Sequence, residues 1–349
     1  MNFSKALLSW YELNHRPLPW RKTKDPYKIW LSEIILQQTR VEQGIPYYNK
    51  LINEFPTIFD LAKAEEAKVL KIWQGLGYYK RAENLHLTAK NIVLNFAGKF
   101  PSSQKELKNL KGIGDYTASA ISSICFNKNE AVVDGNVFRV LGRIFGINIP
   151  INSNKSFKHF KSKANDLMKG APPGTYNQAL MDFGAIQCKP KNPNCKECVF
   201  SKDCYAYKEN KVTFLPVTNN KIKVKTRYFN YLVFQNPKKQ TVLEQRVSKG
   251  IWHKLFEFPV IESKREIKNP STKFNSKIKL YSNEPPTKIF PLSVKPINHK
   301  LTHQKIVVKF WNIKLSRKSS LPVNESDLST FPVPVVIENF ITQHYNRGH

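Results

Sequence analysis

The sequence predicts a mainly α-helical domain followed by a smaller α+β domain. The chain has 349 residues, which suits two domains, and its 41% hydrophobic and 12% aromatic content is enough for packed cores. Apolar residues recur at helical spacing up to about residue 210, and short alternating or β-branched runs follow from residue 228. We therefore expect a helical domain at 1–211, a basic linker at 212–227 and an α+β domain at 228–349.

Helical periodicity in the first domain is interrupted by short segments that contain Gly or Pro. The expected helices cover 5–13, 27–39, 44–54, 66–74, 79–96, 104–109, 116–125, 134–145, 156–168 and 176–186. The expected strands cover 228–235, 240–246, 255–261, 276–281, 305–315 and 333–337, with a closing helix over 335–345. No apolar run reaches the ~18 residues of a membrane span, and the first residues lack signal-peptide features. We expect a cytoplasmic protein without a membrane partner.

The chain is strongly basic, because 56 Lys and Arg residues oppose 26 Asp and Glu residues and give a net charge of +30. Such an excess attracts polyanions through long-range forces and counterion release. The charge therefore predicts a nucleic-acid partner. A lysine-biased genome or an association with ribosomes would explain it as well.

Four of the five cysteines are crowded into residues 188–204 with the pattern C-x6-C-x2-C-x5-C. A cytoplasmic chain should not hold disulfides, so the cluster predicts a metal site. Four thiolates in one loop suit a single [4Fe–4S] cluster, and zinc remains an alternative. The expected ligands are Cys188, Cys195, Cys198 and Cys204. The fifth, Cys125, lies in an apolar stretch and is expected in the core.

A turn with two glycines, Gly112 and Gly114, lies between two helical segments and is flanked by Leu110 and Ile113. Glycine lets the backbone turn tightly and approach a partner closely. The helix that follows presents free N–H groups, which can bind a phosphate. The pattern predicts a helix-hairpin-helix DNA-binding element at about 104–124.

Two acidic residues, Glu33 and Asp134, are candidates for a catalytic role. Glu33 lies in a helical segment whose neighbours three and four residues away are largely apolar, and burial there favours its protonated form. A carboxyl that stays protonated near neutral pH can act as a general acid, unless it reaches solvent at the helix edge. Asp134 follows an apolar run and precedes Gly135 and Asn136, where it can cap a helix, act in catalysis, or do both.

These pieces together resemble a known family. The segments SEIILQQT, GLGYY at 75–79, LKGIGDYTA and VDGNVFRV and the four cysteines occur in the order found in helix-hairpin-helix DNA glycosylases with an iron–sulfur loop. Within that superfamily the chain resembles adenine DNA glycosylases of the MutY type. The match covers about 10–210, and the C-terminal domain is similar in position and texture to the family's Nudix-like domain. No Nudix hydrolase box is present, so we expect no pyrophosphatase activity.

The resemblance implies an enzyme that excises adenine mispaired with 8-oxoguanine or guanine in duplex DNA. Glu33 would protonate the adenine at N7, Asp134 would stabilise the cationic sugar, and Asn136 and Tyr116 would position the reacting groups. Tyr116 occupies the position of the lysine used by endonuclease III-type enzymes, and a phenol cannot form a Schiff base. Little or no β-lyase activity is therefore expected from this chain, which we expect to act as a monomer at the nucleoid.

The resemblance also assigns residues to DNA and lesion recognition. They are Arg16, Arg21, Gln38, Thr39, Tyr78, Gly112, Gly114, Gln178, Thr302 and His303. In the segment Leu301-Thr302-His303, only the histidine matches the family's Phe-Ser-His loop. Two alternatives stay open at this point, an endonuclease III-like glycosylase/lyase and a lesion-binding protein without catalysis. Tyr116 and the second domain argue against the first, and retention of both carboxylates argues against the second.

Overall fold

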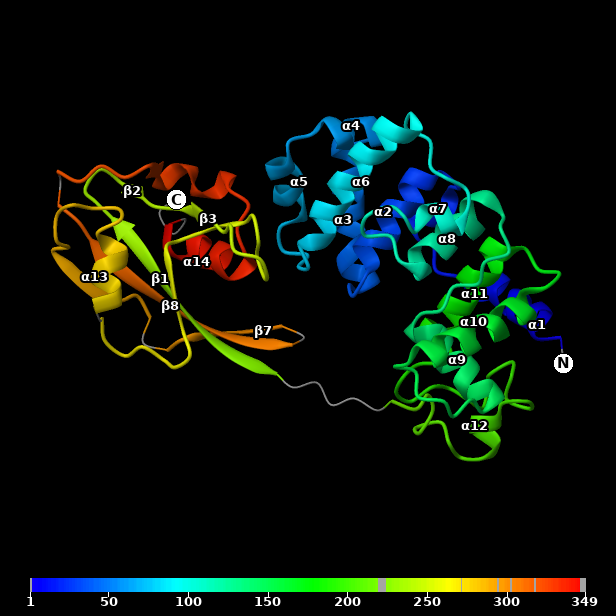
Figure 1. The fold of residues 1–349 in the computed structure, drawn as a ribbon. Coiled ribbons are helices and arrows are strands. Elements are labelled where there is room, and N and C mark those ends of the chain that lie inside the picture. The colour runs from blue at the N-terminus through cyan, green and yellow to red at the C-terminus, as the bar shows by residue number, and fades with distance from the viewer. Residues whose placement is uncertain are drawn as a thin grey trace. The chain divides into compact units, whose positions relative to one another are not determined.

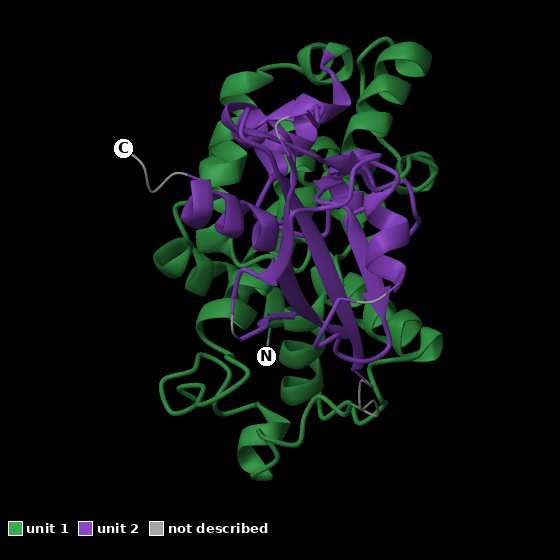
Figure 2. Cartoon of the chain, turned by 90° about the vertical axis from the view of Figure 1, so that its left-hand side faces the viewer, with its two compact units in different colours: residues 1–63, 84–220 green, residues 64–83, 221–349 purple. Residues whose placement is uncertain are grey.

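The computed structural model describes residues 2–218, 224–270, 272–293, 295–301, 303–316 and 318–345. The chain divides into two compact units, which Figure 2 shows in different colours, and Figure 1 labels their helices and strands. The first unit comprises residues 1–63 and 84–220, and the second comprises 64–83 and 221–349. The sequence did not anticipate that residues 64–83 would group with the C-terminal part of the chain.

The first unit is helical, as the periodicity predicts. Its elements are α1 (Phe3–Asn14), η1 (Pro19–Lys22), α2 (Pro26–Leu36), α3 (Val41–Glu54), α4 (Ile58–Lys63), most of α6 (Lys80–Phe96), α7 (Gln104–Leu107), α8 (Asp115–Phe126), α9 (Gly135–Phe145), α10 (Asn154–Met168), α11 (Pro173–Ile186) and α12 (Tyr205–Lys208). Helix α5 (Glu66–Trp73) belongs to the second unit.

Local signals fix the ends of the helices that matter most for the site. Asp25 caps α2 by accepting a 2.9 Å hydrogen bond from the Tyr27 amide, and a proline follows at the first helical position. Helix α9 ends at Phe145, and Gly146 caps it with a φ of +66°, the left-handed conformation typical of a C-terminal cap. Both helices are therefore delimited by sequence-encoded signals.

The expected hairpin lies between α7 and α8. Gly112 has a φ of +82°, and a Cβ atom there would meet the Asn84 side chain at 2.9 Å. Leu110 and Ile113 are buried beneath the turn, and the Thr88 hydroxyl of α6 donates a 2.7 Å hydrogen bond to the Lys111 carbonyl. The turn is thus anchored to α6 while Gly114 at the N-cap of α8 keeps open space around its Cα.

A five-stranded sheet forms the centre of the second unit. The order is β5 (Val260–Ser263), β1 (Lys225–Gln235), β8 (Gln304–Lys314) and β6 (Lys288–Pro291), and β7 (Ile297–Lys300) also pairs with β8. Strands β1 and β8 run parallel over their whole length, from Lys225 opposite Gln304 to Gln235 opposite Lys314, and the other pairs are antiparallel. Two short ribbons pair β2 (Gln240–Thr241) with β9 (Val323–Asn324) and β3 (Glu244–Gln245) with β4 (Phe256–Glu257).

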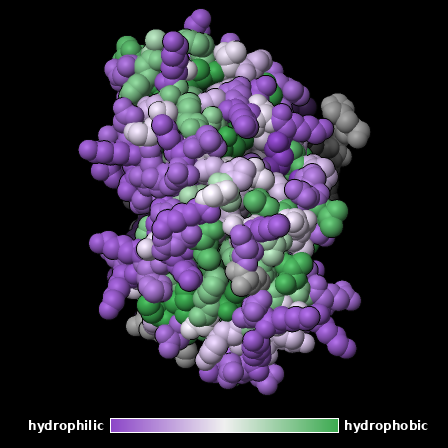
Figure 3. Space-filling view, turned by 90° about the vertical axis from the view of Figure 1, so that its right-hand side faces the viewer, coloured by the Kyte–Doolittle hydropathy of each residue, from purple (hydrophilic) through white to green (hydrophobic). Residues whose placement is uncertain are grey.

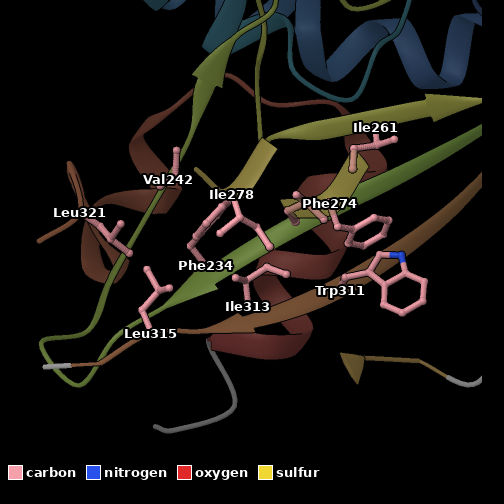
Figure 4. Packing of buried hydrophobic residues seen from close by; sticks show 10 residues of the cluster. Phe234, Val242, Ile261, Phe274, Ile278, Trp311, Ile313, Leu315 and Leu321 are labelled. Carbon is pink, nitrogen blue, oxygen red and sulfur yellow. The ribbon is translucent and has the colours of Figure 1, made fainter. Parts of the chain in front are cut away.

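Successive residues of β8 point to opposite faces of this sheet. Trp311 packs edge-on against Phe274 of α13 (Thr272–Ile278) in the cluster of Figure 4. On the other face Phe310 stacks on Phe340 of α14 (Val335–Tyr345), with ring centroids 3.9 Å apart. Because side chains alternate between the two faces of a strand, α13 covers one face of the sheet and α14 covers the other. The 3-10 helix η2 (Glu325–Thr330) precedes α14.

Four strand predictions need correction. Residues 276–281 are not a strand, because α13 occupies Thr272–Ile278, where Phe274 and Ile278 are spaced to bury one helical face. The expected strands 240–246 and 255–261 are each broken into two short pieces. The segment 333–337 does not form a strand, and α14 begins at Val335, where the closing helix was expected. Strand β1 begins at Lys225, inside the expected linker.

Among the described residues, every helix is too short or too polar to cross a membrane. Figure 3 shows hydrophilic side chains over much of one face, with apolar side chains in smaller patches between them. This surface is in keeping with the strong excess of lysine and arginine in the sequence.

Candidate active site

A cavity of about 440 Å³ opens in the first unit between α2, α8, the start of α9 and α11. This volume is within the ~300–1,000 Å³ typical of small-molecule sites. Eight residues that the family resemblance assigns to catalysis or recognition line it: Arg16, Arg21, Glu33, Thr39, Tyr116, Asp134, Asn136 and Gln178. The fold thus brings together side chains that are up to 162 positions apart in the sequence (Arg16 to Gln178).

Glu33 lies on α2 and is 6% exposed. Burial raises its pKa to about 7, and the Tyr116 hydroxyl and the positive charge of Arg21 offset part of the rise. Within the described part of the chain its buried Oε2 atom has no hydrogen-bond partner. Buried polar atoms are normally satisfied, so an orphaned oxygen beside a cavity indicates a site that a ligand completes.

Tyr116 is in the first turn of α8, directly after the hairpin. Its hydroxyl lies 3.1 Å from the Sδ atom of Met181, which also lines the cavity. Burial, followed by the charge of Glu33, raises the pKa of Tyr116 well above its ordinary value. The phenol therefore stays protonated at neutral pH and can donate one hydrogen bond to a neighbour in the cavity.

Asp134 is the N-cap of α9 and a cavity residue at the same time, so both roles considered from the sequence are compatible. Its Oδ1 atom accepts a 2.8 Å hydrogen bond from the Val137 amide, and its Oδ2 atom accepts one of 2.8 Å from Asn136 Nδ2. Burial raises its pKa, while these two hydrogen bonds act in the opposite direction. The carboxylate is held in one orientation at a helix N-terminus, where negative charge is favoured.

Arg139, which the sequence did not single out, supports this pair from the next turn of α9. Its Nη2 atom donates 2.8 Å and 2.6 Å hydrogen bonds to Asn136 Oδ1 and to the Gly184 carbonyl. Its Nε atom donates a 2.7 Å hydrogen bond to the Cys188 carbonyl. One guanidinium therefore links the start of the cysteine loop to the side chain that orients Asp134.

Asp182 of α11 is a second residue beside this cavity that the sequence did not single out. It is fully buried, and its Oδ1 atom accepts hydrogen bonds from Arg16 Nε at 2.9 Å and Arg21 Nη2 at 3.0 Å. The signal was available, because a carboxylate in an apolar helical segment is the pattern that identified Glu33. Asp182 holds both predicted arginines at the wall of the cavity.

Two predicted recognition residues have a left-handed backbone. Gln38 has a φ of +56° in the first unit, and Tyr78 has a φ of +49° in the second. Gln38 is exposed, and Tyr78 is 46% exposed. This conformation is uncommon for residues other than glycine and clusters at ligand-binding sites. Neither residue lines the cavity that contains Glu33.

The four clustered cysteines line one narrow cavity between α9, α11 and α12. The buried Arg143 of α9 ties down the loop by donating hydrogen bonds to the Lys189 carbonyl at 2.7 Å and the Pro190 carbonyl at 3.1 Å. Its Nη1 atom lies 3.5 Å from Cys188 Sγ. In the described ranges, no three His, Cys, Asp or Glu side chains converge closely enough for a single metal ion.

The predicted lesion-reading residues are in the second unit. His303 is exposed, and its carbonyl accepts a 3.1 Å hydrogen bond from the Lys225 amide. Thr302 lies outside the described residues. A cavity of about 630 Å³ in this unit is lined by His303, Leu301, Trp252 and Tyr78 among others. Two residues assigned to recognition thus share one largely apolar cavity.

Comparisons with known proteins extend over both parts of the chain. A model described as HhH-GPD superfamily base excision DNA repair protein matches residues 31–165, and a NUDIX domain model matches 230–343. The chain is 41% identical over 281 residues to adenine DNA glycosylase of Buchnera aphidicola subsp. Baizongia pistaciae (strain Bp), covering 79% of each protein. It is 33% identical to that of Buchnera aphidicola subsp. Acyrthosiphon pisum (strain APS) over 352 residues, covering 97% of each. A solved thermostable thymine-DNA glycosylase has a TM-score of 0.56 and 33% identity, covering 59% of this chain and 95% of that one.

Proposed function

The chain belongs to the adenine DNA glycosylases, and from this we propose that it hydrolyses the N-glycosidic bond of adenine mispaired with 8-oxoguanine or guanine in duplex DNA. It is a base excision repair enzyme that acts on adenine. One observation carries the proposed chemistry: a buried carboxyl whose pKa is about 7 shares a cavity with a carboxylate fixed at a helix N-cap.

Glu33 is the general acid in this proposal. Adenine in a duplex must leave the base stack before an enzyme can reach it. Adenine is also a poor leaving group until its ring is protonated. A carboxyl with a pKa near 7 is substantially protonated at neutral pH and is still acidic enough to give its proton to N7. The bond from C1′ to N9 then breaks, and its electron pair leaves with the protonated adenine.

Asp134 stabilises the sugar that remains. This sugar resembles an oxocarbenium ion, and an adjacent carboxylate supplies the opposite charge, as paired carboxylates do in glycosidases. The hydrogen bonds from Val137 and Asn136 keep Asp134 oriented and favour its ionised form. Water then adds to C1′, and the ionised Glu33 takes up the proton that this water loses. The product is an abasic site.

Strand cleavage does not follow from this chemistry. A lyase of this superfamily needs an amine at the sugar, and the phenol of Tyr116 stands where that lysine would be. We therefore propose an enzyme with little or no β-lyase activity, whose product breaks only after treatment with alkali.

A [4Fe–4S] cluster on Cys188, Cys195, Cys198 and Cys204 is the cofactor that we propose. The four thiols surround one cavity, and the buried Arg143 supplies positive charge beside Cys188, which suits an anionic group. Four thiolates within one loop suit such a cluster, and a single zinc ion is the alternative that iron analysis would reveal. The hydrolysis needs no electron, so the cluster's contribution is to order the lysine-rich loop at 188–204.

The second unit is proposed to read the base opposite the adenine. His303 is the residue of the family's recognition loop that this chain retains, and its cavity also holds Tyr78. An imidazole can hydrogen-bond a group that 8-oxoguanine has and guanine lacks. The net charge of +30 supports binding to the DNA backbone. We propose that the enzyme is a cytoplasmic protein that binds DNA as a monomer.

The test is incubation with labelled duplexes that contain A:8-oxoguanine or A:G, analysed with and without hot alkali. Release of adenine with cleavage only after alkali is the expected result. Direct cleavage of duplexes with oxidised pyrimidines would favour an endonuclease III-like lyase instead. Binding without release of any base would show a lesion-binding protein.

A further inference from the structure

A hydrogen-bonded chain leads from the buried Asp182 towards the cavity. Asp182 pairs with Arg21, whose Nη2 atom is 3.0 Å from Asp182 Oδ1. The other terminal nitrogen of Arg21, Nη1, donates a hydrogen bond to the hydroxyl of Tyr11 on α1. The Arg21 side chain is only 10% exposed, so both of its terminal nitrogens are committed to protein partners. The guanidinium therefore has a fixed position relative to Tyr11.

Tyr11 connects the fixed guanidinium of Arg21 to the side chain of Gln178. A tyrosine hydroxyl has one hydrogen, and a guanidinium cannot accept a hydrogen bond. The hydroxyl hydrogen must therefore point away from Arg21, and the Gln178 Oε1 atom lies 3.2 Å from the hydroxyl oxygen. The two ends of a glutamine amide are distinguished by such networks. Here the network directs Oε1 towards Tyr11.

The NH₂ group of Gln178 is left for the ligand. Gln178 lines the cavity with Glu33, whereas Tyr11 does not. Within the described part of the chain, the side chain of Gln178 is hydrogen-bonded through Oε1 to Tyr11, and no protein partner accepts from its Nε2 atom. Building on the function proposed above, we propose that Tyr11 is a positioning residue for base selection. It fixes the Gln178 amide so that the cavity presents a donor to the Watson–Crick edge of the extruded base.

A fixed donor selects adenine by the chemistry at N1. Enzymes read an extruded base by hydrogen bonds to its Watson–Crick edge. N1 is the ring acceptor on that edge of adenine, whereas N7, which receives the proton from Glu33, lies on the Hoogsteen edge. In hypoxanthine and guanine N1 carries a hydrogen, so a fixed NH₂ group would face a second donor. This unmatched contact penalises both bases, although their N7 atoms can be protonated like that of adenine.

The test compares wild type with Tyr11→Phe on duplexes with adenine, hypoxanthine or unsubstituted purine opposite 8-oxoguanine, under single-turnover conditions. Without the hydroxyl the Gln178 amide can turn and offer its oxygen to N1–H. We expect the adenine-to-hypoxanthine rate ratio to fall roughly three- to tenfold, the size of one neutral hydrogen bond. Purine keeps N1 as an acceptor, so its rate should change in parallel with that of adenine. Differences between the leaving groups cancel when the two enzymes are compared.

Three controls separate positioning from a structural role. Tyr27→Phe removes a hydroxyl that donates to the Phe55 carbonyl outside the cavity, and it should leave the ratio unchanged. In a Gln178→Met background, Tyr11→Phe should have no further effect on the ratio, because Tyr11 acts through the amide. Binding to a duplex that already contains an abasic site should be unaffected by Tyr11→Phe, since no base is read.

The inference would be overturned if Tyr11→Phe lowered the rates on adenine and hypoxanthine equally. It would also be overturned if Tyr11→Phe changed the rate ratio as much in the Gln178→Met background as in wild type. Either result would leave the proposed function intact. Wild-type protein that releases no adenine from either mispair would refute the proposed function, and the inference would fall with it.

Discussion

Replacing Glu33 by glutamine should abolish adenine release and, above neutral pH, make the protein more stable. Glutamine has nearly the shape of a protonated glutamic acid, so the packing around α2 is kept while the transferable proton is lost. General acid–base groups contribute about 10²–10⁴-fold to the rate, and we expect a loss of that size at pH 7. Binding to the lesion should change little, because the basic surface of the protein is unaltered.

The effect on stability follows from the raised pKa of Glu33. The folded state holds this proton up to a pKa of about 7, whereas the unfolded chain releases it near the ordinary value of 4.5. Between these values the folded state binds more protons, so wild-type stability falls as pH rises through this window. Above pH 7 the buried ionised carboxylate costs about 3 kcal/mol, which glutamine does not.

Urea unfolding of the cofactor-loaded protein, followed by tryptophan fluorescence at pH 5 and pH 8, measures the difference. The variant should exceed wild type at pH 8 by up to about 3 kcal/mol and by much less at pH 5. The wild-type single-turnover rate should also decline as pH rises above about 7. An equal stability difference at both pH values, or a loss of activity below tenfold, would refute the assignment of Glu33.

Three further predictions concern other parts of the chain. Asp134→Asn should lower single-turnover excision about 10²–10³-fold with little change in melting temperature, because asparagine is an equally good N-cap; a stable and active variant would contradict the role of the charge. Protein purified anaerobically should contain four irons per chain, and Cys198→Ser should lower that content, whereas stoichiometric zinc without iron would rule out the cluster. His303→Ala should reduce the preference for A:8-oxoguanine over A:guanine duplexes by up to roughly tenfold in Kd at fixed salt, and an unchanged ratio would remove His303 from lesion reading.

The sequence predicted those residues of the candidate site whose type is unusual among their neighbours in the chain. Glu33 is a carboxylate in an apolar helical segment, and the cysteines are crowded at a spacing that a core does not require. The family resemblance then ordered these residues into one enzyme, and the relatives confirm the family. Asp182 carried the same local signal as Glu33, so it could have been found in the same way.

Local periodicity failed where packing decided the outcome. The segment 276–281 alternates like a strand, yet Phe274 and Ile278 lie on one face of α13 and bury it in the core beside Trp311. In a segment this short, the intrinsic preference for strand structure is weaker than the gain from burying apolar side chains against the core. The broken strands at 240–246 and 255–261 have the same origin, because pairing to different partners ends each piece after two to four residues.

The sequence by itself determined the two types of domain, the hairpin glycines, the paired carboxylates and the four thiols, because each depends on residue type and short-range spacing. Only the tertiary structure decided that Tyr11 meets Gln178 across 167 positions, that Asp182 pairs with Arg16 and Arg21, and that Arg139 links the cysteine loop to Asn136. These contacts join helices that are distant in the chain. Their partners are selected by how the helices pack, and no periodicity in one segment contains that information.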